Sequence, residues 1–242
     1  MKKIIGRKPV LEAINSGKEI DRVIVALGQK GGIIDSIRIA SKKRKIKFTQ
    51  LSPNKFKEYG KDAHTQGVVA LTSDYKYYHL DDIISISKNS KFPFLLLLDS
   101  IQDTHNLGAI IRTAESAGVD GVIITERNSA SINETVEKTS AGAVSHVKVV
   151  KVSNLRNTMK ELKTEGFWIV GTSLEAEKSY DAIDYKMPVA VIVGNEEKGI
   201  RKLVSEECDF LVKIPMLGKI QSLNVSVSAG IMMYEVVRQR KE

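Results

Sequence analysis

Several features that commonly define a protein class are scarce or missing in this chain of 242 residues. It has one cysteine, Cys208, which excludes an internal disulfide and any zinc site built on Cys-x-x-Cys pairs. No run approaches the roughly 18 apolar residues of a membrane span, and the start has no apolar stretch long enough for a secretory signal. These absences predict a cytoplasmic protein with ordinary hydrophobic cores.

The common nucleotide-binding and metal-binding signatures are absent too. Neither GxGxxG nor GxxxxGK[ST] occurs, so the usual dinucleotide and P-loop motifs are missing. His79, His105 and His146 lack the spacing of metal ligands, and no metal is expected.

Positive charge is concentrated at one end of the chain. The net charge is +8, and residues 1–75 hold 16 Lys and Arg against 7 Asp and Glu, so the basic excess lies there. Its densest point is the run 42–47. That run fits either a solvated helix end or a contact with a polyanion, and the asymmetry of the whole chain favours nucleic acid.

The first third reads as a small α/β domain. Residues 1–75 alternate helix and strand signals, whereas residues 76–92 are polar with only a short helical hint and are interpreted as a linker. The expected helices are 9–14 and 33–43, and the expected strands are 22–27, 46–51 and 67–71.

Residues 93–242 read as a second, larger α/β domain. Apolar runs without alternation are typical of strands buried on both faces, and helical segments fall between them. This order predicts a parallel sheet covered by helices. The expected strands are 94–98, 122–125, 147–152, 167–172, 189–193 and 208–214, and the expected helices are 107–117, 133–139, 155–164, 198–205 and 225–240.

Three loops after these strands carry candidate chemistry, because open α/β sheets bind ligands beyond the carboxyl ends of their strands. The first leads to Asn106 and to Arg112, about 120° further round a helix, from where a long side chain can reach back. The second, 194–200, has glycines that allow close backbone approach. In the third, 214–228, Ser222 and Asn224 fall at a strand-to-helix junction with exposed amides. Each loop alone fits a simple turn, and their occurrence together favours a site.

The three loops resemble the motifs of the SpoU (TrmH-type) branch of the SPOUT superfamily, RNA ribose 2′-O-methyltransferases that use S-adenosylmethionine. The segments that carry the resemblance are 106–112, 192–200 and 214–226. Segments 6–13 and 64–70 resemble the family's substrate-binding domain, so the likeness covers essentially the whole chain. The closing segment 234–240 resembles the branch that methylates a guanosine in the P loop of 23S rRNA.

Several expectations about fold and assembly follow from this resemblance alone. It implies a deep trefoil knot in the C-terminal domain, where spacing by itself gives an open doubly wound sheet. It also implies a homodimer formed through the knotted domain. The apolar face within 231–237 fits that interface or simple burial in the core.

The resemblance also implies roles for individual residues. The catalytic set is Asn106, Arg112, Glu196, Ser222 and Asn224. The main cofactor contacts are Gly194, Ile214 and Leu223, with Thr172, Leu174, Asn195, Gly199 and Met216 beside them. The expected RNA contacts are Arg7, Lys8, His64 and Gln66 in the family-like segments and, from the basic run, Lys42, Arg44 and Lys45. His64 and Gln66 fit turn-formers of the basic domain equally well. Asn195 and Glu197 depart from the family pattern, since many relatives have smaller residues there.

Three alternatives stay open at this point. Arg112 fits a general base or, given the high pKa of arginine, a group that binds phosphate and stabilises an incipient alkoxide. The substrate fits ribosomal RNA or a tRNA guanosine, and an idle RNA-binding ribosome-assembly factor is the rival from another class. Trp168 is interpreted as packing in the core or linker rather than as a stacking platform for bases.

Overall fold

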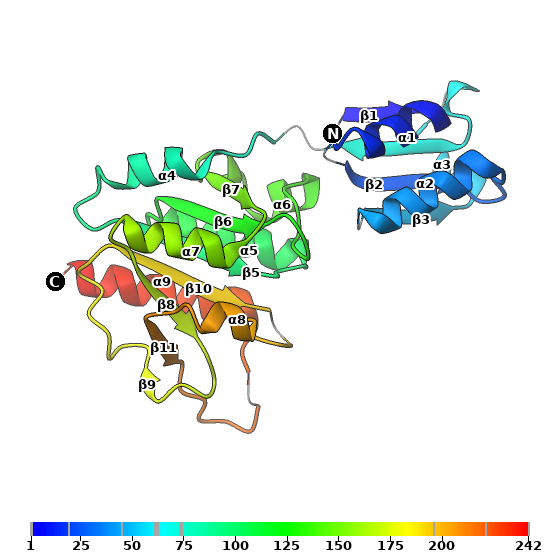
Figure 1. The fold of residues 1–242 in the computed structure, drawn as a ribbon. Coiled ribbons are helices and arrows are strands. Elements are labelled where there is room, and N and C mark those ends of the chain that lie inside the picture. Colours follow the sequence, from blue (N-terminus) through cyan, green and yellow to red (C-terminus); the bar gives the residue numbers. More distant parts are fainter. Residues whose placement is uncertain are drawn as a thin grey trace. The chain divides into compact units, whose positions relative to one another are not determined.

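The computed structural model describes residues 2–18, 20–44, 46–60, 63–72, 75–195, 197–220 and 222–241. They form two compact units: Met1–Tyr75 with Ser131–Glu134, and Lys76–Ala130 with Thr135–Glu242 (Figure 1). None of the described helices is long and apolar enough to cross a membrane.

The first unit is a four-stranded sheet in the order β1-β4-β2-β3. β4 pairs antiparallel with β1 and β2, whereas β2 and β3 are parallel. Its elements are β1 (Lys2–Ile5), α1 (Arg7–Asn15), β2 (Ile20–Ala26), α2 (Gly32–Lys43), β3 (Lys47–Leu51), α3 (Pro53–Phe56), η1 (Ala63–Thr65) and β4 (Val68–Thr72).

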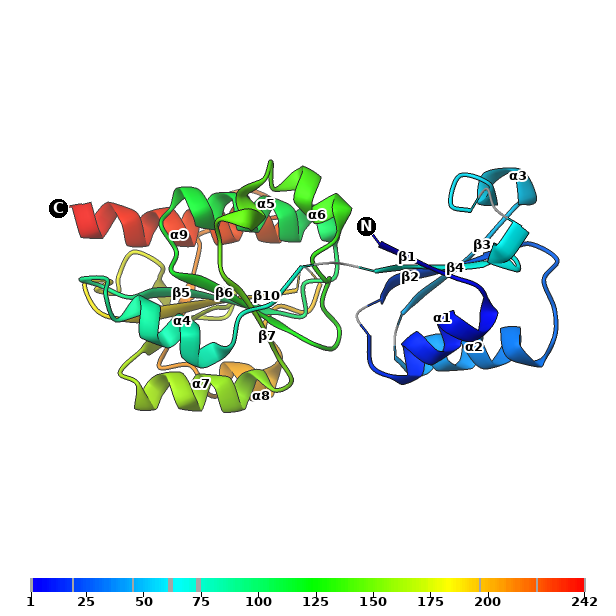
Figure 2. The ribbon, with the colours of Figure 1, turned by 90° about the horizontal axis from the view of Figure 1, so that it is seen from above.

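Both faces of this sheet are covered. Val23 and Val25 of β2 join the core cluster that includes Val10 of α1 and Ile37 of α2, whereas alternate residues such as Ile24 pack with Phe56 of α3 on the other face. Figure 2 shows α1 and α2 on the face opposite α3. The alternation is the period of two expected of a strand.

The second unit is a seven-stranded sheet in the order β7-β6-β5-β10-β8-β11-β9, and every pairing in it is parallel. The predicted helix-covered parallel sheet is confirmed. Its strands are β5 (Phe94–Asp99), β6 (Gly121–Thr125), β7 (Val149–Val152), β8 (Trp168–Thr172), β9 (Lys178–Ser179), β10 (Val189–Gly194) and β11 (Phe210–Lys213). Its helices are α4 (Leu80–Ser87), α5 (Thr104–Ser116), α6 (Glu134–Thr139), η2 (Ala143–Ser145), α7 (Leu155–Thr164), α8 (Lys202–Ser205) and α9 (Val225–Lys241).

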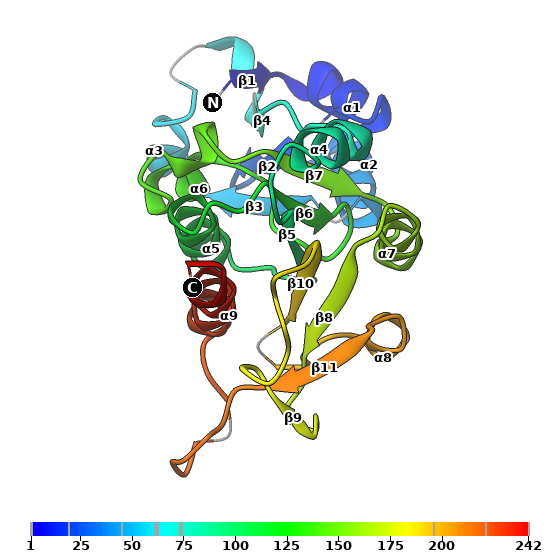
Figure 3. The same ribbon diagram turned by 90° about the vertical axis from the view of Figure 1, so that its left-hand side faces the viewer.

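The helices of this unit lie in two layers. α5 and α9 cover one face of the sheet, and α4, α7 and α8 cover the other, as Figures 2 and 3 show. β5 and β10 lie next to each other at the centre, and all their residues are buried. The ends of these two strands therefore bring the first two motif loops to one edge of the sheet.

Two expected elements differ from the structure. Residues 76–92, interpreted as a linker, contain α4, whose Ile83 and Ile84 are buried in the core of the second unit. The short helical hint in this segment was therefore a helix that belongs to the second unit. The helix expected at 198–205 begins only at Lys202, because Asn195 and Gly199 are held together in a tight turn by two backbone hydrogen bonds.

Candidate functional site

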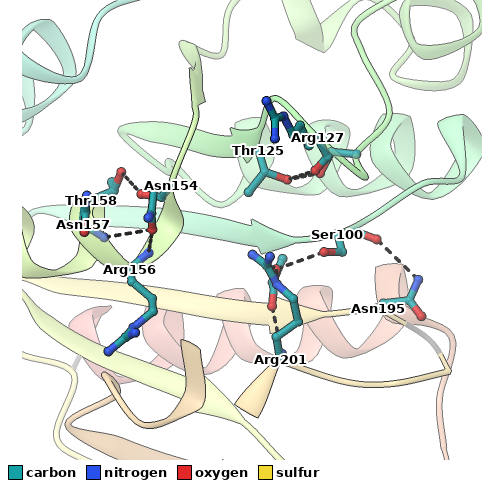
Figure 4. Close-up of polar contacts among 11 residues, drawn as sticks. Ser100, Thr125, Arg127, Asn154, Arg156, Asn157, Thr158, Asn195 and Arg201 are labelled. Carbon is teal, nitrogen blue, oxygen red and sulfur yellow. Dashed lines mark hydrogen bonds and ion pairs between the residues drawn. The ribbon is translucent and has the colours of Figure 1, made fainter. Parts of the chain in front are cut away.

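The first two motif loops start side by side. Gly194 at the end of β10 is in register with Asp99 at the end of β5. Asn195 then donates from Nδ2 to the carbonyl oxygen of Ser100 over 3.4 Å, a contact drawn in Figure 4. The loops that follow both central strands are thus joined at the carboxyl edge of the sheet, where open α/β sheets bind ligands.

Asp99 fixes the far side of the second loop. Its side chain is fully buried and accepts hydrogen bonds from the backbone N–H of Arg201 at 2.9 Å and from Arg201 Nε at 2.7 Å. The Arg201 guanidinium also forms an ion pair with Asp99 at 2.7 Å, and the Arg201 side chain stays half exposed. One carboxylate thus ties the end of the 194–201 segment to β5.

We expect Asp99→Asn to lower the free energy of unfolding by about 2 kcal/mol, because the amide loses the charge-assisted hydrogen bonds that Arg201 donates. Urea unfolding measures this change. The matched control is Glu165→Gln, which removes the exposed ion pair with Lys88 and should alter the free energy by less than about 0.5 kcal/mol. Equal effects of the two substitutions would contradict the anchoring role.

The glycines of the second loop serve the loop itself. A Cβ on Gly194 would lie 2.0 Å from the carbonyl carbon of Gly199, so only glycine permits this backbone approach. Gly199 has a left-handed φ of 62°, and Asn195 Oδ1 accepts from the N–H of Glu197 at 3.0 Å. The geometry requires Gly194 for the fold of the turn, independently of any ligand. Glu196, predicted as catalytic, lies outside the described residues.

Two predicted catalytic residues from distant parts of the chain meet. Asn224 donates from Nδ2 to Asn106 Oδ1 at 3.0 Å, across 118 residues of sequence. Each residue is held in its own helix start: Asp103 caps α5 by accepting from the N–H of Asn106 at 3.1 Å, and Asn224 Oδ1 accepts from the N–H of Ser226 at 2.9 Å at the start of α9. The first and third motifs therefore form one polar cluster.

Arg112 and Ser222 are placed differently. Arg112 is exposed, lies six residues or about 1.7 helical turns along α5 from Asn106, and lines a cavity with the segment 140–146. Ser222 is also exposed, next to the Asn106–Asn224 pair in sequence. The structure shows no direct contact between Arg112 and the asparagine pair among the residues it describes.

A second cavity, of about 470 Å³, lies between the loop after β8 and the loop after β11. It brings together three of the predicted cofactor residues, Leu174, Ile214 and Met216, and adds Ile220 and Lys213, which sequence reasoning missed. Thr172 and the half-buried Leu223 lie next to these loops in sequence without lining the cavity. Two of the lining side chains are apolar and exposed, Leu174 at 58% and Ile220 at 78%. A cavity with such walls is suited to a flat ring that packs against apolar side chains.

The predicted RNA-binding residues of the first unit divide into two groups. Arg7 and Gln66 meet: Arg7 donates from Nε to the carbonyl oxygen of Gln66 at 3.1 Å and from its guanidinium to Gln29. No signal in the sequence pointed to Gln29. In the structure its side chain packs against Gly67, where a Cβ would lie 2.6 Å from it. Arg44 instead donates to the carbonyl oxygens of Ile14 and Gly17, which stabilises the end of α1.

The remaining predicted RNA contacts are surface residues. Lys8, Lys42 and His64 are exposed, and Lys45 lies outside the described residues.

Trp168 corrects an expectation about packing: its side chain is 46% exposed and stacks on Phe210 at 5.6 Å between ring centroids. Burial raises the pKa of the Cys208 thiol to about 12, so this cysteine is a neutral packing residue rather than a nucleophile.

The geometry defines a two-part α/β protein: a parallel-sheet domain with a polar site at the strand ends, and a separate basic α/β domain. Residues 93–234 match the model of the SpoU rRNA Methylase family, and residues 3–78 match the model for RNA 2′-O ribose methyltransferase substrate binding. The chain therefore belongs to the SpoU (TrmH-type) family of RNA 2′-O-methyltransferases, which act on tRNA or rRNA.

Relatives of known sequence and structure agree with this assignment. A protein of Staphylococcus saprophyticus, named as a TrmH family tRNA/rRNA methyltransferase, is 42% identical over 98% of this chain and 95% of its own length. The AdoMet-bound rRNA methyltransferase of Sinorhizobium meliloti aligns with a TM-score of 0.64 and 25% identity, covering 98% of this chain and 86% of that one. The TrmH/SpoU tRNA-modifying enzyme of A. aeolicus has a TM-score of 0.57 and 34% identity, covering 67% and 82%.

Proposed function

We propose that this enzyme methylates the ribose 2′-hydroxyl of a guanosine in the P loop of 23S rRNA. The observation that carries the methyl-transfer assignment to these residues is the hydrogen bond between Asn224 and Asn106. It assembles the first and third motifs into one cluster beside the strand ends. The choice of 23S rRNA is supported by the resemblance of the closing segment 234–240 and by the separate basic domain.

S-adenosylmethionine is the methyl donor, and its sulfonium supplies an electrophilic methyl group when bound. The 470 Å³ cavity fits this molecule chemically, because Leu174, Ile214 and Met216 offer apolar walls for an adenine ring. The loop 214–220 belongs to neither helix nor strand, so its backbone groups are candidates for polar contacts with the same molecule. We infer that Gly194, Asn195 and Gly199 support this pocket through the turn after β10, and that Thr172 at the end of β8 and Leu223 before α9 adjoin it.

Arg112 is the residue that acts on the hydroxyl. A ribose hydroxyl is a weak nucleophile until its proton leaves or its developing negative charge is stabilised. The guanidinium of the exposed Arg112 has no hydrogen bond or ion pair among the described residues, so its five donors are free for a phosphate and an alkoxide. Asn106, Ser222 and Asn224 orient the nucleotide and the loop, and Glu196 orients Arg112.

The N-terminal unit holds the RNA. Arg7 lies beside Gln66 and Gln29, and the exposed Lys8, Lys42 and His64 add donors for phosphates, with Lys45 continuing the basic run. Lysine and arginine contacts of this kind supply affinity without sequence preference. Arg44 contributes through its positive charge, because its donors are occupied by the end of α1.

The C-terminal domain forms a trefoil knot and pairs with a second copy of the chain. Helix α9 has apolar residues on two faces. Met232 and Val236 are fully buried in the domain, whereas Val227 and Tyr234 are about half exposed, at 49% and 50%. Leu217 in the third motif is also an exposed apolar residue, at 98%. We propose that the exposed face of α9 with Val227 and Tyr234 is the homodimer interface of a cytoplasmic enzyme.

Mapping ribose methylation across ribosomal and transfer RNA in a strain lacking the protein tests the assignment. We expect the loss of one methyl group, on a guanosine in the P loop of 23S rRNA, and its return with the wild-type gene but not with Arg112→Ala. Loss of a methyl group from a tRNA would support the alternative substrate, which the similarity to the tRNA-modifying enzyme of A. aeolicus favours. No lost methyl group, together with no heat of binding for S-adenosylmethionine, would mean an idle RNA-binding assembly factor.

A further inference from the structure

An open cavity of about 300 Å³ lies beside Arg112, between the second half of α5 and the segment 140–146. It is separate from the apolar cavity at Leu174 and shares no lining residue with it. Its ionisable side chains are Arg112, Glu115 and His146. A cavity that contains the proposed catalytic arginine and further polar groups is the place where the target nucleotide would bind.

The wall of this cavity is built by a close approach of two segments. A Cβ on Gly108, one turn before Arg112, would lie 1.8 Å from Thr139 Oγ1 and 3.1 Å from the backbone nitrogen of Ser140. The chain then passes through two consecutive left-handed residues, Ala141 with φ 51° and Gly142 with φ 85°. A left-handed backbone at a non-glycine residue such as Ala141 costs about 1 kcal/mol or more. Backbone strain of this kind concentrates at functional sites.

Glu115 is the unexplained group in the cavity. It lies three residues after Arg112 on α5, yet neither side chain has a hydrogen bond or ion pair among the described residues. A carboxylate in the last turn of a helix is also unfavourable, because it faces the negative end of the helix dipole. An exposed, unpaired carboxylate at such a position stabilises nothing in the fold that the structure describes.

We propose that Glu115 recognises the target base and selects guanine. This inference rests on the proposed function, since it assigns the specificity of the same site. Guanine presents two adjacent donors, N1–H and the N2 amino group, on its Watson–Crick edge, and a carboxylate accepts from both. Adenine has an acceptor at N1, and cytosine and uracil each offer a single donor on that edge. Arg112, three residues away, then lies on the ribose and phosphate side of the same nucleotide.

The test compares two RNA hairpins, one with the nucleotide that the methylation mapping identifies and one with adenosine in its place. We expect Glu115→Ala to lower kcat/KM on the guanosine RNA by about tenfold or more, the range of a bidentate base contact, and to leave the adenosine RNA unchanged. Glu115→Gln keeps one acceptor and should fall between. Binding of S-adenosylmethionine and the melting temperature should not decrease, because Glu115 faces neither the apolar cavity nor a partner.

Glu137→Gln is the matched control, since this exposed carboxylate on α6 lies outside the cavity. It should leave the guanosine-to-adenosine ratio unchanged. A ratio that Glu115→Ala does not alter, or an equal loss on both RNAs, would overturn the inference while leaving methyl transfer intact. A mapped target that is not a guanosine would overturn it directly, and a tRNA guanosine would leave it standing although the 23S assignment fails.

Discussion

Arg112→Lys should reduce turnover of RNA by at least about a hundredfold while leaving the binding of S-adenosylmethionine unchanged. Lysine keeps the positive charge but offers a compact ammonium in place of a planar fork, so it cannot hold a phosphate and a developing alkoxide with parallel donors. The substitution should also fold normally, because the exposed Arg112 side chain has no hydrogen bond or ion pair among the described residues. Single-turnover methylation with tritiated cofactor measures the rate, and calorimetry measures the cofactor affinity.

The control for this substitution is Arg127→Lys. Arg127 is an exposed arginine on the loop after β6. Its backbone carbonyl oxygen accepts from Thr125 Oγ1 at 2.8 Å, and its guanidinium takes no part in this contact (Figure 4). Its replacement should leave the rate unchanged. Near-normal turnover of Arg112→Lys would show that charge alone suffices, and the guanidinium geometry would then have no role in the reaction.

Gly194→Ala should abolish the second motif as a binding loop. The added Cβ would overlap the backbone of Gly199 and Ile200, at 2.0 and 2.1 Å, and neither atom belongs to a flexible side chain that can move away. We expect a loss of about 2–3 kcal/mol in the free energy of unfolding. Affinity for S-adenosylmethionine should fall at least about tenfold, because the turn adjoins the strand ends. Urea unfolding and calorimetry measure the two effects.

Gly230→Ala is the comparison that isolates this steric effect. Gly230 lies within α9, and a Cβ there would meet its nearest neighbour, Thr113 Cγ2, at an ordinary 3.8 Å. Alanine favours the helix by about 1 kcal/mol, so this variant should be as stable as the wild type or more stable. A Gly194→Ala protein that binds the cofactor normally would mean that the turn is not part of the pocket.

Local patterns in the sequence predicted the central sheet well. The apolar run at 94–98 and the run at 189–193 became β5 and β10, because strands buried on both faces need apolar residues at every position. The start of α5 came earlier than expected, at Thr104, since Asp103 is the residue that caps it. A polar residue before a helix is a readable signal, and with it the boundary could have been predicted.

The arrangement of the site was less accessible to the sequence. The pairing of Asn106 with Asn224 depends on how two helices 118 residues apart pack, and no local pattern contains that information. The same holds for Gln29, which reaches Arg7 only through the fold of the first unit. The basic run gave no sign that the Arg44 guanidinium also stabilises the end of α1, and the predicted RNA contact of this residue stays a prediction. Motif spacing identifies residues, and packing decides their neighbours.

The link between Asn106 and Asn224 also has a consequence for the order of events during synthesis. Asn106 leaves the ribosome 118 residues before Asn224, and at elongation rates of about 5–20 residues per second the interval is roughly 6–24 s. The N-terminal unit is synthesised by Tyr75, apart from residues 131–134. It therefore has time to fold and to bind RNA in that interval. A nascent chain would therefore hold RNA before it can modify it, and methylation would begin only after α9 has docked against α5.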